Sequence, residues 1–163
     1  MRVKEGFAVD IFALVDDLYK HISGHLDKPY AIYGHSMGGR LAFLLAHKIQ
    51  TEKNKRPIHL FISGTGAPSM EPKEAPKHLL PGGQFLDAIK EMGGFPDEVL
   101  AHPELLDYFE PILRADFRVS ETYIHNSAAP LNIPITVMYG DEEDMEEKDV
   151  LAWQNESIIP VNF

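Results

Sequence analysis

Residues 30–39 read YAIYGHSMGG, and this stretch decides the fold. The apolar run at its start, bounded by a proline and by Gly34, is typical of a buried strand. Residues 37–52 then carry apolar side chains at helical spacing. A serine in a Gly-x-Ser-x-Gly frame between a strand and a helix sits at a sharp turn, so we expect Gly34 and Gly38 to supply the room that it needs. The frame therefore predicts an exposed hydroxyl, that of Ser36, at the end of a strand.

The sequence on both sides of this corner alternates between helix and strand patterns. Residues 10–26 repeat apolar side chains at the spacing of an amphipathic helix. Two further apolar runs, IHLFISG (58–64) and PITVMYG (134–140), predict buried strands. This alternation indicates an α/β fold with a mostly parallel sheet. A chain of 163 residues is long enough for one domain with a core, so we treat residues 1–163 as a single domain.

Residues 65–127 follow a different pattern from the rest of the chain. Proline and glycine stand early in this segment, and apolar stripes at helical spacing follow, such as Phe85, Leu86, Ile89 and Met92. Alternating strand patterns do not occur there. A long helical insertion between two strands predicts a lid over a site. The alternative is a helical layer that only completes the core.

The composition limits the partners of the protein. It has 25 acidic and 15 basic residues, a formal net charge of −10, which argues against nucleic acid or an anionic membrane as the main partner. The absence of cysteine excludes disulfides and thiolate metal sites. No N-terminal apolar stretch has the length of a signal sequence or a membrane span. We therefore expect a cytoplasmic protein that holds no metal and binds neither nucleic acid nor membrane.

A serine nucleophile needs a base and an acid that orients the base, and in this type of fold they follow the serine in the order acid, histidine. The strand pattern at 134–140 is followed by four acidic residues, Asp141, Glu142, Glu143 and Asp144. The main-chain N–H of Met37, at the start of a helix, is expected to bind an oxyanion. The eight histidines stand at positions 21, 25, 35, 47, 59, 78, 102 and 125, so none follows the acidic residues.

Several segments together resemble one enzyme family. They are GHSMGGRLAFLLAHKI (34–49), LPGGQFLDAIKEMGGFPDEVL (80–100), PILRADFRVSETYIH (111–125), PITVMYGDEED (134–144) and Trp153. They resemble the type II thioesterases of nonribosomal-peptide and polyketide assembly lines, which are α/β-hydrolases. The similarity extends from about Val3 to Phe163, and the segments within 65–127 make it more specific than the serine motif alone.

The resemblance implies an activity and a set of site residues. Enzymes of this family remove acyl groups from the phosphopantetheine arm of a carrier protein, so the substrate arrives on a partner and no resident cofactor is expected. Ser36 matches the family's nucleophile, and Met37 matches one oxyanion donor. The family's acid usually lies three residues beyond the glycine, which here is Glu143; a shift of one residue gives Asp144. We favour Asp144 over Glu143.

The sequence departs from the family at both ends. The family's early strands, with the loop that carries the second oxyanion donor, and its Gly-Gly-His-Phe segment, with the catalytic histidine, have no counterpart here. We therefore expect a partial α/β-hydrolase fold whose isolated chain is impaired, with exposed sheet edges that favour self-association. One alternative is a non-catalytic module that binds an acyl chain or a carrier protein. Another is a generic carboxylesterase, which the resemblance within 65–127 disfavours.

Overall fold

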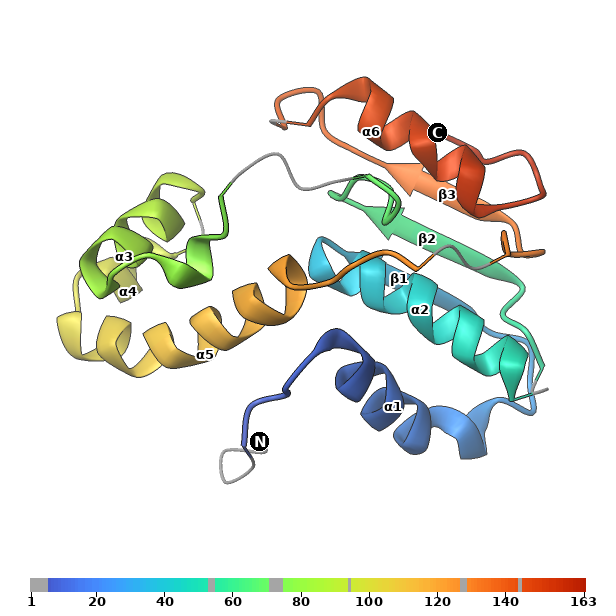
Figure 1. The fold of residues 1–163 in the computed structure, drawn as a ribbon, viewed down its shortest axis with the longest axis horizontal. Coiled ribbons are helices and arrows are strands. Elements are labelled where there is room, and N and C mark those ends of the chain that lie inside the picture. The colour runs from blue at the N-terminus through green and yellow to red at the C-terminus, as the bar shows by residue number, and fades with distance from the viewer. Residues whose placement is uncertain (1–5, 53–54, 71–74, 94, 127–128, 144) are drawn as a thin grey trace. The chain divides into compact units, whose positions relative to one another are not determined.

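The computed structural model describes residues 6–52, 55–70, 75–93, 95–126, 129–143 and 145–163 (Figure 1). The elements are α1 (Ile11–Ile22), η1 (Ser23–His25), β1 (Ala31–His35), α2 (Met37–Thr51), β2 (His59–Ser63), η2 (Lys77–Leu79), α3 (Gly82–Glu91), α4 (Asp97–Leu100), α5 (Pro103–Glu121), β3 (Ile135–Met138), α6 (Glu147–Leu151) and η3 (Ala152–Glu156). They divide into two compact units. The helical unit comprises Met1–Ile11 and Pro72–Tyr123, and the sheet unit comprises Phe12–Glu71 and Ile124–Phe163.

The sheet unit contains three parallel strands in the order β1-β2-β3. Gly34 of β1 lies opposite Ile62 of β2, which lies opposite Val137 of β3. The predicted α/β fold with a parallel sheet is therefore confirmed. The predicted helix over 10–26 is shorter than expected, because the regular helix ends at Ile22 and a 3₁₀ turn follows.

One face of this sheet forms the core of the sheet unit. Leu60 and Ile62 of β2 alternate inward and are fully buried, as are Ile135 and Val137 of β3. Residues of α2, α6 and η3 cover them, namely Ala42, Phe43, Ala46, Val150 and Trp153. The indole N–H of Trp153 donates to the carbonyl oxygen of Thr65 at 3.0 Å, so this ring is buried without losing its polar contact. Each such large side chain contributes about 1.5–3 kcal/mol through burial.

The two edges of the sheet differ. Beside β3, the N–H of Val137 donates to the carbonyl oxygen of Asn162, and the N–H of Asn162 donates to that of Ile135. The C-terminal segment therefore covers the outer edge of β3. Among the described residues no strand pairs with the outer edge of β1. Self-association through exposed edges stays a prediction, and it now concerns β1 alone.

The helical unit is built around α5. Its buried apolar side chains are Ile11, Phe85, Ile89, Leu106 and Val119. Among its described residues no strand occurs, as the pattern of segment 65–127 predicted. That this segment forms a lid over Ser36 stays a prediction. In neither unit do the described helices include one long and apolar enough to cross a membrane.

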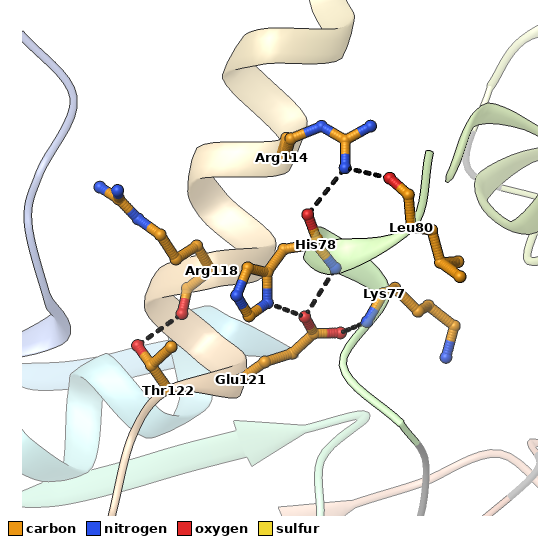
Figure 2. Close-up of polar contacts among 7 residues, drawn as sticks. All are labelled: Lys77, His78, Leu80, Arg114, Arg118, Glu121 and Thr122. Atoms are coloured by element: carbon orange, nitrogen blue, oxygen red, sulfur yellow. Dashed lines mark hydrogen bonds and ion pairs between the residues drawn. The ribbon is translucent and has the colours of Figure 1, made fainter. Parts of the chain in front are cut away.

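Polar contacts from α5 hold the short helix η2 at its first turn (Figure 2). The carboxylate of Glu121 accepts hydrogen bonds from the main-chain N–H groups of Lys77, at 2.8 Å, and His78, at 3.0 Å. It also lies 2.7 Å from Nδ1 of His78. The first N–H groups of a helix have no partner within it, so Glu121 caps η2 from another element.

Arg114, which lies two turns before Glu121 on α5, holds the other end of η2 (Figure 2). Its guanidinium donates to the carbonyl oxygens of His78 and Leu80, both at 2.7 Å, and to Glu110, also at 2.7 Å. The same group stacks over the ring of Phe85 on α3, 4.2 Å from the ring centroid. We call Arg114 and Glu121 the α5 clamp, because they bind opposite ends of η2 with opposite charges.

Candidate active site at the end of β1

Ser36 occupies a strained turn between β1 and α2. Its φ is +53° and its ψ is −122°, and among the described residues no other non-glycine residue has a positive φ. Backbone of this kind costs about 1–3 kcal/mol and persists only where its surroundings enforce it. The side chain is exposed and makes no capping hydrogen bond to α2. The hydroxyl is therefore held at the surface, as the sequence frame predicted.

Close packing of two glycines permits the turn. A Cβ atom on Gly34 would lie 2.0 Å from the carbonyl oxygen of Gly38, and one on Gly39 would lie 2.7 Å from Cγ2 of Thr65. A Cβ atom on Gly38 would meet no atom within 4 Å. The prediction that Gly38 must lack a side chain is therefore wrong: the backbone of Gly38 is what excludes a side chain from Gly34.

Backbone hydrogen bonds fix the turn from two sides. The N–H of Ser36 donates to the carbonyl oxygen of Ser63 at 2.9 Å, and the N–H of Gly39 donates to that of Ser36 at 2.9 Å. Met37 is the first residue of α2, and N–H groups at this position have no partner within the helix. Together with the helix dipole, this amide offers a site for negative charge beside the hydroxyl.

Asp141, Glu142 and Glu143 lie at the same edge of the sheet as Ser36, because they follow β3 and Ser36 follows β1, and these strands are parallel. Because β2 lies between β1 and β3, the axes of β1 and β3 are about 10 Å apart. Asp141, Glu142 and Glu143 are exposed. Glu143 lies in a turn, with its side chain folded back against Gly140. Asp144 lies outside the described residues.

Three histidines, one each on β1, α2 and β2, contact side chains other than that of Ser36. Nδ1 of His35 lies 2.9 Å from the hydroxyl oxygen of Ser63. The ring of His47 packs edge-on against Phe43 within the sheet unit, and burial lowers the pKa of His47, with a smaller contribution from His125. Nε2 of His59 lies 2.8 Å from the hydroxyl oxygen of Thr136. Among the described residues, no group of three or more His, Cys, Asp or Glu side chains is placed to hold a metal ion.

Sequence reasoning missed Ser63. Its hydroxyl oxygen lies 2.9 Å from the phenol oxygen of Tyr33 and 2.9 Å from Nδ1 of His35. The sequence places Ser63 only near the end of the predicted strand 58–64, and the structure adds the parallel register, in which His35 lies opposite Ser63. A polar residue ending the second strand therefore had to lie beside the serine turn.

Comparison with known proteins agrees with this geometry. The family described as thioesterase domain matches residues 2–163. The chain belongs to the thioesterase domain family. The gramicidin S biosynthesis protein GrsT of Aneurinibacillus migulanus is 33% identical over 145 residues, which are 88% of this chain and 57% of GrsT. The chain thus spans little more than half the length of this relative.

Solved structures with the same fold include a type II thioesterase. ClbQ from the colibactin NRPS/PKS pathway superimposes with a TM-score of 0.92 and 32% identity, over 99% of this chain and 69% of ClbQ. The type II thioesterase BorB from the borrelidin biosynthetic cluster gives a TM-score of 0.83 and 28% identity, over 94% of this chain and 62% of BorB. The resemblance inferred from the sequence is confirmed, and so is the α/β-hydrolase fold class.

Proposed function

We propose that this chain carries the nucleophile of a thioesterase that releases acyl groups from the phosphopantetheine arm of a carrier protein. The observation that carries the proposal is the strained, exposed Ser36 between β1 and α2. Such strain is typical of functional sites, because ordinary packing gives no reason to keep it. The biosynthetic pathways named for GrsT and ClbQ favour a carrier-bound acyl substrate.

In the proposed reaction, the Ser36 hydroxyl attacks the thioester carbonyl while a base takes its proton. The tetrahedral oxyanion lies against the Met37 N–H, and its collapse expels the pantetheine sulfur, which leaves as the thiol. Water then hydrolyses the acyl-serine. Asp144, or Glu143 in its place, orients and stabilises the imidazole that serves as the base. No resident cofactor takes part in these steps.

The 163-residue polypeptide has no histidine after residue 125. Without a base, the hydroxyl is a poor nucleophile, and only the contribution of binding and oxyanion contacts remains. We therefore expect this polypeptide, assayed alone, to acylate at Ser36 slowly and to turn over more slowly still.

Carrier proteins are acidic and this chain carries a net charge of −10, so docking must depend on local patches rather than on long-range attraction. The sequence suggests basic side chains at Lys73, Lys77 and Arg114 for this purpose. Lys73 lies outside the described residues. Arg114 is bound to η2 and Glu110, which removes it as a docking cation.

The test is to incubate the polypeptide with an acyl-pantetheine thioester in excess and to follow the intact protein mass. We expect slow addition of one acyl group, which is lost in Ser36→Ala. Titration with an acyl-loaded carrier protein addresses the alternative of a non-catalytic module. Equal binding by wild type and Ser36→Ala, with no acyl adduct in either, would favour that alternative. Faster acylation by the matching oxygen ester would indicate a carboxylesterase.

A further inference from the structure

The strained turn at Ser36 needs restraint from its surroundings. Ser63 restrains it by binding both Ser36 and His35. The carbonyl oxygen of Ser63 accepts the N–H of Ser36. The hydroxyl of the same residue bonds the ring of His35, the residue before Ser36. Ser63 is thus bound to both residues at which β1 turns into α2.

The ring of His35 is also confined by shape. Gly64 has a φ of +59°, and a Cβ atom there would lie 2.7 Å from Cε1 of His35. The imidazole therefore lies directly against Gly64. The N–H of Gly64 donates to the carbonyl oxygen of Met138 at 3.1 Å, which links this position to β3.

Tyr33 completes a short chain of polar groups. It lies two residues before His35 on the same face of β1, and its phenol oxygen is 2.9 Å from the hydroxyl oxygen of Ser63. The Ser63 hydroxyl has one proton to donate. It either donates to Nδ1 of His35 while it accepts from Tyr33, or accepts from Nδ1–H, in which case the Tyr33 phenol can donate to it or accept from it. Either arrangement holds His35 in one tautomer.

We infer that Ser63 is a positioning residue for the serine turn, which it holds through the Ser36 amide on one side and the His35 ring on the other. This inference rests on the proposed role of Ser36 as nucleophile. Ser63 lies at the end of β2 and acts through its neighbours, so its removal should misplace the hydroxyl rather than remove any reacting group.

The test uses two readouts on the full polypeptide. The first is the rate at which a fluorophosphonate probe labels Ser36, measured by protein mass. The second is the ring ¹⁵N spectrum of His35, which reports its tautomer. Ser63→Ala should slow labelling about tenfold and change the His35 spectrum, since misplaced reacting groups lose rate steeply. Ser63→Thr keeps the hydroxyl and should restore both.

Thr136→Val is the matched control, because it removes a hydroxyl that bonds another imidazole, that of His59, from β3. It should leave labelling and the His35 spectrum unchanged. Labelling of Ser63→Ala at the wild-type rate, with an unchanged His35 spectrum, would overturn the inference. If wild type itself is not labelled, the proposed nucleophile gains no support, and the His35 spectrum alone then decides the role of Ser63. If Ser63→Ala does not fold, Ser63→Cys takes its place, because a thiol is a much weaker hydrogen-bond partner of similar shape. Labelling at the wild-type rate with an unchanged His35 spectrum in that variant counts against the inference.

Discussion

The sheet unit and the helical unit are stabilised by different interactions. In the sheet unit, fully buried apolar side chains from β2, β3 and α2 pack into one cluster with Trp153. In the helical unit, fewer apolar side chains are buried, and the α5 clamp joins η2 to α5 through charged groups. Apolar packing tolerates changes in the solvent that weaken charge interactions, whereas a partly buried clamp depends on every one of its partners. Different substitutions should therefore destabilise the two units.

The largest expected effect lies in the sheet unit, at Gly34. A Cβ atom in Gly34→Ala would lie 2.0 Å from a backbone oxygen that cannot move without breaking the turn. We expect the free energy of unfolding to fall by more than about 3 kcal/mol. Urea unfolding followed by the fluorescence of Trp153, the single tryptophan and a buried residue of this unit, measures the change.

Gly38→Ala is the matched control for that substitution. A Cβ atom there meets nothing within 4 Å, and the residue lies in the first turn of α2. Alanine should be neutral or should stabilise by about 0.5–1 kcal/mol. Equal losses in both variants would mean that the close approach between Gly34 and Gly38 does not govern the turn.

The second effect concerns the helical unit alone. Glu121→Gln removes the charge that three donors of η2 share, while its amide keeps one acceptor oxygen. We expect a loss of about 2 kcal/mol, because hydrogen bonds to charged, partly buried groups are the stronger ones. Amide hydrogen exchange at Lys77 or His78 should accelerate, since one of these two N–H groups then faces the amide nitrogen in place of an acceptor oxygen.

Another histidine–glutamate pair of the same unit provides the control. His102 and Glu104 lie 3.1 Å apart, but their side chains are 57% and 71% exposed, against 12% and 19% for His78 and Glu121. Glu104→Gln should change the stability by less than about 0.5 kcal/mol, because exposed ion pairs contribute little. Similar losses in Glu121→Gln and Glu104→Gln would show that burial does not distinguish the clamp from a surface pair.

This contrast also explains how far the sequence could predict the structure. The strands of the sheet unit begin and end within two residues of the apolar runs, because burial on a sheet leaves a local pattern. The turn at Ser36 was predictable because its glycines are neighbours in the sequence. The partners of Glu121 lie 43 and 44 residues away, and those of Ser63 lie 28 and 30 residues away. No local pattern records such contacts, so the clamp and the role of Ser63 required the structure.

The smallest expected effect is a loss of stability of the sheet unit at acid pH, which depends on His47. Burial lowers the pKa of His47 below its ordinary value of 6.5, so the folded sheet unit excludes a proton that the unfolded chain binds. The stability contributed by neutral His47 is complete above about pH 6.5 and is lost as the pH falls below that value. The ring is only half-buried, so we expect a loss of less than about 1 kcal/mol between pH 7 and pH 5.

His47→Gln tests this expectation, since it removes the titrating group from the sheet unit. The stability of that unit, followed by the fluorescence of Trp153, should then fall less between pH 7 and pH 5 than it does in wild type. His125→Gln removes the neighbouring imidazole and should keep most of the pH dependence, because burial is the larger cause of the lowered pKa. If His125→Gln flattens the pH dependence as fully as His47→Gln, the repulsion between the two rings, and not the packing around α2, controls the acid sensitivity of the sheet unit.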